Sequence, residues 1–453
     1  MKPSIPKGTR DFLPDEVYKR QYIFNTIRKV YEKFGFLPIE TPAMESLQTL
    51  TGKYGEEGDK LLFKILNNGD FLKNADPEAL KNQSSEALLP TIAKRGLRYD
   101  LTVPFARFVV MHQNELAFPF KRYQMQPVWR ADRPQKSRYQ EFWQCDADVI
   151  GSSSLLYEAE MIQMLYEVFH KLGVEVIIRM NNRKILQGIT EVFGIEKYFI
   201  DLTIAIDKLE KIGQDLVLQE LVQKGITEKT GQEVLNLVER SDPDTLRTKL
   251  RSSKTGMEGL RDLESIAALL SGHPAWSSVK IHVALARGLN YYTGCIFEVI
   301  ANPAIYPELK IGSLSGGGRY DDLTSIFGMP GVSGVGISFG ADRIYDAMLH
   351  LDLFPPYIHK GPVILFLPMD STYVPYAFTQ VTHLRDSGIP ADIYPEGAKI
   401  QKQMKYANAT GVPYIAIIGE KEYQSSLMTL KNMQTGQQSE VNRDQLIEIL
   451  KSV

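Results

Sequence analysis

Apolar residues recur at helical spacing near the start of the chain. Ile23, Ile27 and Val30 follow one another at steps of four and three, which places them on one face of an amphipathic helix. Gly35 is suited to end this helix in the left-handed conformation. The run FLPIET that follows has strand character, and Pro42 ends it because proline lacks a backbone donor. The pattern therefore predicts a long helix that leads into a strand.

The same reasoning predicts further helices and strands before residue 182. Two β-like runs, LRYDLTVP and KRYQMQPVWR, flank a helical stretch at 105–111. A second helix is predicted over 155–172, and VEVIIRMNN follows it as a strand. The run LLFKILNNGDFLK predicts a hairpin that turns at Asn68-Gly69.

The pattern of apolar and polar residues then changes twice along the chain. From about 183 to 276, aliphatic residues recur at helical spacing among many charges, which predicts a separate, mostly helical insert. Strand-like runs resume with VKIHVAL and CIFEVIA. Pro355 and Pro356 mark a linker, and a βαβαβ pattern begins beyond it with VILFL. This alternation predicts a small α/β domain with a mostly parallel sheet.

Composition and charge narrow the class of protein. A chain of 453 residues is expected to hold two to three domains, and 43% hydrophobic with 23% charged residues is typical of a soluble globular protein. Because the formal net charge is −2, any RNA binding must rest on local patches. No apolar run approaches about 18 residues, so we expect no membrane span.

Cysteine and histidine usage argue against structural bridges and metal centres. Cys145 and Cys295 are too few for a disulfide scaffold or a cysteine-rich zinc site. No H-E-x-x-H motif occurs and the seven histidines are scattered, so we expect no catalytic zinc and assign no metal ligands. The N-terminal segment MKPSIPKGTRDFLPDE lacks the apolar core of a secretory signal. A cytoplasmic, reducing location fits these features best.

The common nucleotide-binding signatures are absent. The chain has no G-x-x-x-x-G-K-[ST], which excludes a P-loop. In GVSGVGISFG, Gly334, Gly336 and Gly340 have a spacing one residue too long for a dinucleotide turn, and they open no N-terminal βαβ unit. A Rossmann-type site is therefore not expected.

Arginines instead accumulate in one stretch that otherwise has the pattern of ordered core. In WRADRPQKSRYQEFWQ, Arg130 follows a β-like run, Arg133 and Arg138 lie in a turn, and Phe142 lies on the return strand. Guanidinium groups match phosphate oxygens in pairs, so such a hairpin could clamp a triphosphate and stack a base. A solvated charged hairpin is the alternative.

Three further arginines stand beside glycines or aromatic residues. In ALARGLNYYTG, Arg287 follows an apolar run, where a charge is costly without a partner. In LSGGGRYDD, three glycines precede Arg319, and they allow either close approach of a ligand or a flexible turn. Arg343 in FGADRI falls in a helix, where a surface ion pair is the alternative to a ligand contact.

Taken together, these segments resemble the histidyl-tRNA synthetase family of class II aminoacyl-tRNA synthetases over nearly the whole chain. The helix ending at Gly35 and the strand ending at Pro42 resemble motif 1, which builds the dimer interface in the family. PVWRADRPQKSRYQEFWQCD resembles motif 2 and GVGISFGADRI resembles motif 3. LARGLNYYTG and SGGGRYDDL resemble the two histidine-specific signatures.

The resemblance implies an organisation into three domains. An α+β catalytic domain with an antiparallel sheet would comprise residues 1–182 and 277–350. A mostly helical insertion would occupy 183–276, and an anticodon-binding α/β domain with a mostly parallel sheet would occupy 361–453.

The resemblance also implies an activity. The protein would activate histidine with ATP and Mg²⁺ to histidyl-adenylate and pyrophosphate, and then transfer histidine to the 3′ end of its tRNA. A homodimer is implied as well. In the C-terminal domain, Lys399, Lys402 and Lys405 stand at helical spacing and could meet tRNA phosphates.

Site residues are carried over position by position. The catalytic residues would be Arg130 and Arg287 at the α-phosphate, with Arg287 also at the substrate carboxylate. Further ATP contacts would come from Arg138 and Arg343 at the γ-phosphate and Phe142 on adenine. Histidine would meet Asp100, Thr102 and Gln144 with its α-amino group, and Asp148, Tyr291 or Tyr292, and Tyr320 with its imidazole.

Four positions differ from the commonest family pattern, namely Asp132, Ser137, Gln140 and Asn290. A non-catalytic relative, either a regulatory subunit of histidine biosynthesis or a sensor of uncharged tRNA, is the alternative function. Such relatives often lose the motif arginines, and regulatory subunits lack the C-terminal domain. This sequence has both the motif arginines and the pattern of the C-terminal domain.

Overall fold

The computed structural model describes residues 2–52, 55–135, 137–240, 242–286, 291–356, 358, 361–395 and 398–451. The chain divides into two compact units, Met1–Phe354 and Pro355–Val453, each of which is described by itself.

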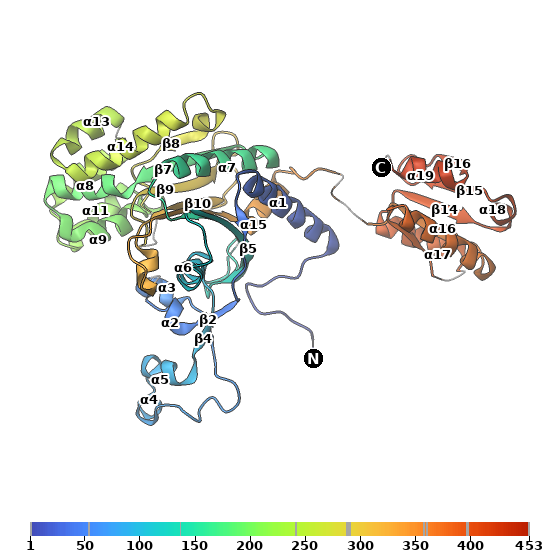
Figure 1. The fold of residues 1–453 in the computed structure, drawn as a ribbon, viewed down its shortest axis with the longest axis horizontal. Helices are drawn as coiled ribbons and strands as arrows, with labels where there is room; N and C mark the ends of the chain where they lie inside the picture. Colours follow the sequence, from blue (N-terminus) through green and yellow to red (C-terminus); the bar gives the residue numbers. More distant parts are fainter. Residues whose placement is uncertain are drawn as a thin grey trace. The chain divides into compact units, whose positions relative to one another are not determined.

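The first unit is built on an eight-stranded sheet (Figure 1). Its strands, in spatial order, are β1 (Leu37–Pro38), β5 (Phe120–Trp129), β6 (Glu141–Ile150), β11 (Gly334–Gly340), β10 (Ser315–Tyr320), β9 (Cys295–Ala301), β7 (Val176–Asn182) and β8 (Val279–Ile281). Only the outer pairs β1–β5 and β7–β8 are parallel, and the five inner pairings are antiparallel. The predicted antiparallel sheet is confirmed.

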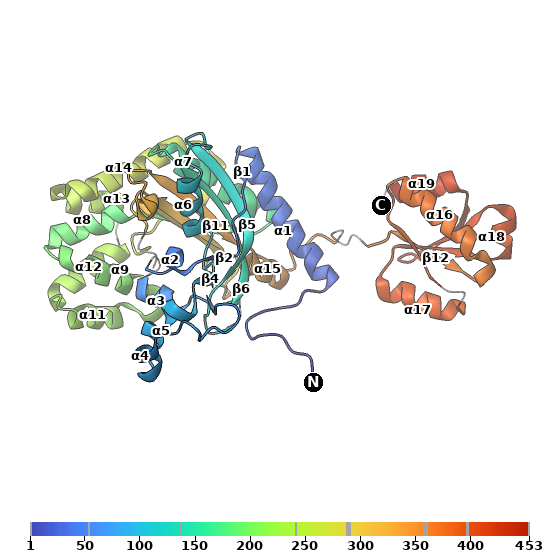
Figure 2. The same ribbon diagram turned by 60° about the horizontal axis from the view of Figure 1, so that its bottom comes forward.

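Three helices cover one face of this sheet: α1 (Pro14–Lys33), α7 (Leu156–Leu172) and α15 (Ala341–His350). Figures 1 and 2 show α1 lying alongside the twisted strands β5 and β6. Cys145, Ala147 and Val149 of β6 are fully buried in the core that these helices share with the sheet. Because side chains alternate along a strand, the residues between them face the opposite side. That opposite side carries the polar groups.

The N-terminal helix and strand follow the sequence pattern, with one difference. The chain leaves α1 through Gly35 at φ +79°, the left-handed conformation expected of it. The strand is shorter than FLPIET, because only Leu37 and Pro38 pair with β5. Pro38 and Pro42 bring no backbone donor, which limits how far the ladder can extend.

A second, three-stranded sheet corrects the hairpin expected at Asn68-Gly69. It consists of β2 (Met44–Ser46), β4 (Arg95–Leu97) and β3 (Lys64–Ile65). Gly69 does turn the chain, at φ +75°, but β3 pairs with the distant β4 and not with residues just after the turn. The hairpin prediction was therefore wrong.

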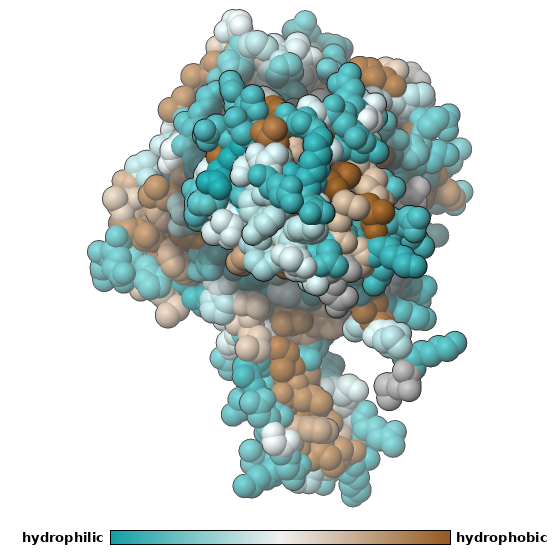
Figure 3. Space-filling view, turned by 90° about the vertical axis from the view of Figure 1, so that its right-hand side faces the viewer, coloured by the Kyte–Doolittle hydropathy of each residue, from teal (hydrophilic) through white to brown (hydrophobic). Residues whose placement is uncertain are grey.

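The chain between β3 and β4 forms an arm that projects from the first unit (Figure 1). It contains the short helices α4 (Pro77–Lys81) and α5 (Ser85–Ile92). Leu66, Phe71, Leu72 and Leu80 are exposed on it, and Figure 3 shows apolar surface running along its length. Three further helices lie next to these strands in the sequence: α2 (Leu47–Leu50) and α3 (Gly55–Lys60) between β2 and β3, and α6 (Thr102–Met111) after β4.

Helices dominate the chain between β7 and β8. They are α8 (Arg183–Phe193), α9 (Phe199–Ile206), α10 (Leu209–Ile212), α11 (Gln214–Gln223), α12 (Glu228–Arg240), α13 (Pro243–Lys249) and α14 (Lys254–Leu269). Ile185, Leu186 and Ile189 of α8 belong to the same hydrophobic core as the strand residue Ile178. These helices therefore pack against the sheet without a separate core.

The second unit has a five-stranded sheet in the order β13 (Ala391–Ile393), β12 (Ile364–Pro368), β14 (Tyr414–Ile418), β15 (Met428–Asn432) and β16 (Gln438–Val441). Its helices are α16 (Val374–Asp386), α17 (Ile400–Thr410), α18 (Glu420–Ser425) and α19 (Arg443–Lys451). The predicted βαβαβ core is present, with β12 parallel to β13 and β14. Two further strands, which the sequence pattern did not identify, add antiparallel pairings.

None of the helices in the described segments combines the length and apolar character that a bilayer span requires.

One buried ion pair ties helix α7 to the middle of the large sheet. Arg319 of β10 donates to both carboxylate oxygens of Glu158, at 2.5 and 2.6 Å, and Glu158 is fully buried. Nη1 of Arg319 also donates to the carbonyl oxygen of Ser152 at 3.1 Å. Arg319, expected from sequence to follow a glycine-rich ligand loop or turn, is therefore a structural residue.

We expect Arg319→Met to lower the free energy of unfolding of the first unit by about 3–5 kcal/mol, because Glu158 would remain buried without its partner. Urea unfolding followed by tryptophan fluorescence measures this unit alone, since all three tryptophans lie in it, at positions 129, 143 and 276.

Lys33→Met provides the control. Lys33 pairs with Glu167 at 2.9 Å but is 64% exposed, so its loss should cost less than about 1 kcal/mol. Equal effects of the two substitutions would show that burial does not set the contribution of the Arg319 pair.

Candidate active site

A cavity of about 250 Å³ lies on the polar face of the large sheet. Eleven of the twelve residues predicted from sequence line it: Asp100, Thr102, Arg130, Arg138, Phe142, Gln144, Asp148, Tyr291, Tyr292, Tyr320 and Arg343. The twelfth, Arg287, lies outside the described residues, as does Asn290. Residues from five distant segments of the chain therefore meet in one cavity.

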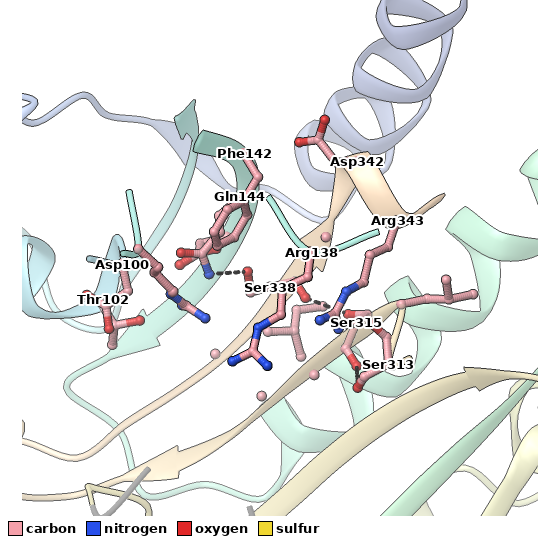
Figure 4. A pocket seen from close by; sticks show the side chains of 18 of the residues that line it. Asp100, Thr102, Arg138, Phe142, Gln144, Ser313, Ser315, Ser338, Asp342 and Arg343 are labelled. Carbon is pink, nitrogen blue, oxygen red and sulfur yellow. Dashed lines mark hydrogen bonds between the residues drawn. The ribbon is translucent and has the colours of Figure 1, made fainter. Parts of the chain in front are cut away.

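The cavity has two chemically different ends. Figure 4 shows Asp100 and Thr102 on one side and Arg138 and Arg343 on the other, with Gln144 and Ser338 between them. The first side is acidic and lies beside the start of α6, and the second is basic and lies beside the start of α15.

Backbone carbonyl groups orient two guanidinium groups that line the cavity, Arg130 beside Tyr99 and Arg343 beside Ser313. Arg130 donates from Nε to the carbonyl oxygen of Tyr99 at 3.1 Å, and its guanidinium lies 4.3 Å from the ring centroid of Tyr99 and 5.1 Å from that of Phe142. Arg343 donates to the carbonyl oxygens of Ser313 at 2.9 Å and Ser137 at 3.3 Å. Their positive charge is thus aimed into a half-buried space that suits an anion.

Arg138 behaves differently from these two. It is 49% exposed on its side chain and pairs with Asp132 at 2.7 Å. Arg133, also in this turn, is exposed and does not line the cavity. The alternative of a wholly solvated charged hairpin is therefore wrong, although two of its arginines do reach solvent.

Asp342 holds the basic end in place. It accepts hydrogen bonds from the backbone N–H of Trp143 at 2.8 Å and from Nη1 of Arg20 at 2.5 Å, and it also pairs with Arg10. This carboxylate joins α15, β6, α1 and the N-terminal segment. Its neighbour Arg343 is fixed as a result.

At the acidic end, an ion pair and a hydrogen bond hold Asp148. Nη2 of the fully buried Arg122 lies 2.7 Å from Oδ2, and the hydroxyl of Tyr320 donates to Oδ1 at 2.6 Å. Burial raises the pKa of Asp148, while the charge of Arg122 and the Tyr320 hydrogen bond oppose that rise. The carboxylate is therefore fixed in orientation deep in the cavity.

Glycines of β11 make room for this pair. Gly336 stands directly opposite Asp148 in the sheet, and a Cβ there would fall 2.0 Å from Oδ1 of Asp148. Gly334 stands opposite Tyr320, and a Cβ there would fall 2.4 Å from its ring. The spaced glycines that superficially resembled a dinucleotide turn therefore lie in a central strand. Two of them leave room for the side chains of Asp148 and Tyr320.

The glycines of SGGGRY do not form a flexible turn either. They lie in β10, which is buried along its whole length. A Cβ on Gly318 would fall 2.6 Å from the carbonyl oxygen of Cys295 and 2.8 Å from the ring of Tyr292. The flexible turn is therefore wrong, and the close approach that these glycines allow is to other parts of the protein. Gly316 and Gly317 also line the cavity, so approach of a ligand there stays a prediction.

Three tyrosines form the wall beside the acidic end. The ring centroid of Tyr291 lies 4.8 Å from that of Tyr292 and 6.3 Å from that of Tyr320. Burial raises the pKa of Tyr291 and of Tyr320 well above the usual value, so both keep their protons. Tyr291 also shares a side-chain hydrogen bond with Thr102.

Sequence reasoning missed a carboxylate in this cavity, Asp146. It is 2% exposed, and burial raises its pKa to about 7. Its Oδ1 has no hydrogen-bond partner among the described residues. A signal was available, because polar residues at 144, 146 and 148 alternate with apolar ones at 145, 147 and 149.

The raised pKa of Asp146 gives a testable stability effect. The folded state holds this proton more tightly than the unfolded state, whose aspartates titrate near 3.8, so Asp146 costs stability as pH rises from about 4 to about 7. Asp146→Asn should therefore stabilise the first unit, with an advantage that grows by up to about 1.4 kcal/mol per pH unit in that window.

Urea unfolding at pH 5 and pH 8 measures the difference. Asp262→Asn, which alters a carboxylate outside the cavity paired with Lys184, provides the control. An advantage of the Asp146 variant that does not change with pH would contradict the raised pKa.

Comparison with known proteins agrees with this geometry. The profile of the family described as "Histidyl-tRNA synthetase" matches residues 89–344, and that of "Anticodon binding domain" matches residues 363–453. A curated "Histidine--tRNA ligase" of Phocaeicola vulgatus is 52% identical, with 100% of this chain and 99% of the relative covered. One of Christiangramia forsetii is also 52% identical, with 99% of each chain covered.

A solved structure leads to the same conclusion. The crystal structure of histidyl-tRNA synthetase from Nostoc sp. superposes with a TM-score of 0.82 at 31% identity, covering 100% of this chain and 99% of that one. This chain belongs to the histidyl-tRNA synthetase family.

Proposed function

We propose that this protein is a histidine–tRNA ligase, which activates histidine with ATP and transfers it to the 3′ end of its tRNA. The observation that carries the proposal is one cavity with oriented guanidinium groups at one end and a fixed carboxylate–tyrosine pair at the other. A cavity of this kind suits a reaction between an anionic nucleotide and a small polar amino acid.

Arginines at the basic end would bind the nucleotide. Arg130 would hold the α-phosphate, Arg343 the γ-phosphate with help from Arg138, and Phe142 would stack on adenine. We keep Arg287 as the expected ligand of the α-phosphate and the substrate carboxylate. The histidine carboxylate must attack the α-phosphorus, which brings anion against anion, and preoriented cations lower that barrier.

Mg²⁺ would enter with ATP. Among the described residues, no group of three or more histidine, cysteine or acidic side chains is placed to hold a metal ion. Magnesium commonly binds through substrate phosphates and water with few protein ligands. It would supply further neutralisation of phosphate charge, and the arginines perform the orientation.

The acidic end would select histidine. Asp148 and Tyr320, with Tyr291 or Tyr292, would contact the imidazole, whereas Asp100, Thr102 and Gln144 would take the α-amino group. An amino acid without the imidazole would leave the buried polar groups of Asp148 and Tyr320 without a hydrogen-bond partner from the ligand. Sites of this type can reject such analogues by about 10⁴-fold or more.

The proposed domains follow the sequence expectation. Residues 1–182 and 277–350 would carry out catalysis, 183–276 would form the helical insertion, and 361–453 would bind the anticodon end of the tRNA. Lys399, Lys402 and Lys405 are exposed at one end of α17 and along it, whereas Gln403 and Ala407 of this helix are buried. Their contact with phosphates would weaken as salt rises.

We further propose a cytoplasmic homodimer. Strand β1 is the outer strand of the large sheet, and its Leu37 is exposed. An open edge with an apolar side chain favours pairing with another chain. The alternative of a non-catalytic relative finds no support, because Arg130 and Arg343 both line the cavity.

Pyrophosphate exchange into ATP, measured with each amino acid in turn, tests the proposed function. We expect exchange with histidine alone. Arg130→Ala should slow exchange by about 100-fold or more, because a charge aimed at the reacting phosphate is removed. Arg133→Ala is the matched control, since Arg133 lies outside the cavity, and it should exchange at nearly the parental rate. A folded protein without histidine-dependent exchange would overturn the proposal.

Gly336→Ala tests the acidic end. The new Cβ would displace Asp148 from Arg122 and Tyr320, so KM for histidine should rise between about 10- and 100-fold while KM for ATP stays nearly constant. Gly340→Ala, on the same strand, meets nothing closer than 3.4 Å and should leave KM for histidine unchanged. Equal histidine KM values for the two variants would contradict the assignment of Asp148.

A further inference from the structure

We propose that Asp146 is a second charged partner of the α-ammonium group of histidine, beside Asp100 and acting with Gln144. The inference rests on the proposed function and adds a residue that the family resemblance did not supply. Asp146 is a buried carboxylate that lines the cavity and is not among the predicted site residues.

The position of Asp146 on β6 fits this part of the substrate. Gln144, Asp146 and Asp148 project from the same face of the strand into the cavity. Residues two apart on a strand are neighbours on the same face. A histidine whose imidazole contacts Asp148 can therefore bring its ammonium group to the Asp146 side of the cavity.

The neighbours of Asp146 do not satisfy it. Gln124, directly opposite on β5, directs its amide Nε2 to Thr41 at 2.8 Å and to Gln126 at 2.6 Å. Ser338, directly opposite on β11, makes a side-chain hydrogen bond to Asp146. That leaves Oδ1 of Asp146 buried without a partner among the described residues. Burying such an acceptor is costly unless a ligand supplies the donor.

A second open acceptor stands beside it. Nε2 of Gln144 donates to the hydroxyl of Ser338 at 2.9 Å, and that hydroxyl donates a hydrogen bond to Asp146. These hydrogen bonds fix the orientation of the Gln144 amide. Its Oε1 is left without a hydrogen-bond partner among the described residues. Two acceptors so placed match an ammonium group, which has three donors to offer.

The charge balance also calls for a cation. Asp100, Asp146 and Asp148 line the acidic end, whereas Arg122 is already committed to Asp148 at 2.7 Å. Arg98, just after β4, acts on Asp146, but its guanidinium is engaged with the carbonyl oxygens of Thr41 and Pro127. An ammonium group between Asp100 and Asp146 would neutralise part of this excess negative charge.

The same arrangement makes recognition of the ammonium group depend on pH. The charged and titratable groups that face Asp146 are Arg122 on β5, Asp148 on β6, Asp100 before α6, Arg98 after β4 and Tyr31 on α1. Protonation of Asp146 near pH 7 would remove the charge that attracts the ammonium group. Ammonium binding should therefore weaken as pH falls below about 7.

Two ligands isolate the contact. Histidine and imidazolepropionic acid share the ring and the carboxylate and differ in the amino group. Their affinities for the full-length protein are to be measured by calorimetry between pH 5.5 and pH 8. The α-ammonium group of histidine lowers the pKa of its ring, so the two rings titrate over different pH ranges. The affinity ratio of the two ligands is therefore compared between the wild-type protein and Asp146→Asn, which removes the contribution of the rings. We expect the wild-type ratio to rise with pH relative to that of the variant, and parallel pH profiles would overturn the proposal.

Asp146→Asn assigns the effect to one residue. It should weaken histidine binding by about 10- to 100-fold, the loss of one charge-assisted hydrogen bond, and leave imidazolepropionic acid within about threefold. The pH dependence that remains in the ratio should be that of the two rings alone. Asp262→Asn should behave as wild type. Equal weakening of both ligands, or a ratio with the same pH profile as in the wild-type protein, would overturn the role of Asp146.

The failure of this inference is distinguishable from failure of the proposed function. If the wild-type protein exchanges pyrophosphate with histidine but Asp146→Asn binds histidine normally, the inference alone is wrong. If the wild-type protein neither binds histidine nor supports exchange, the proposed function is wrong as well.

Discussion

The ion pair between Arg122 and Asp148 is the constraint on which the rest of the cavity depends. Arg122 is fully buried, lies 4.2 Å from the ring centroid of Phe105 and donates to the carbonyl oxygen of Leu101 at 3.3 Å. One guanidinium thus ties the sheet to the segment that carries Asp100 and Thr102. Breaking a pair at this depth would leave a buried charge without a partner. Loss of the pair should therefore disturb the sheet, helix α6 and the cavity together.

The two ends of the cavity are built by different means. Carbonyl oxygens hold Arg130, which follows a strand end, and Arg343, which lies in a helix, and the Asp342 network holds the start of that helix. At the acidic end, strand register decides the geometry, because Asp148 lies over Gly336 and Tyr320 over Gly334. An extended substrate can lie between them, with its charged groups matched to opposite ends.

Sequence periodicity was a good guide where elements bury one face. Helices α1 and α7, strand β7 and the βαβαβ core of the second unit all follow from it, because each pairs an apolar face with the core. It failed at the Asn68-Gly69 turn, since β3 finds its partner across the whole arm and no local signal records that pairing. The three glycines before Arg319 were ambiguous for a similar reason, because the backbone atoms that need the space belong to Cys295 and to β11.

Candidate site residues came mainly from resemblance, and the cavity gathers every one that falls within the described part of the chain. Asp146 was missed because the resemblance gave it no role, although it ends the motif 2 segment and its alternation with Cys145 and Ala147 marked it as facing away from the core. Residue spacing carried that information, and only the neighbours Gln124 and Ser338 show that its oxygen lacks a partner.

The alternation along β6 also limits how this protein can change. Inserting or deleting a single residue in that strand would turn Cys145, Ala147 and Val149 toward the substrate and push three polar side chains into the apolar layer beneath the helices. The arm between β3 and β4, which no strand register constrains, could lengthen or shorten without such a penalty. Length variation among relatives should therefore concentrate in that arm and avoid β6 and β11.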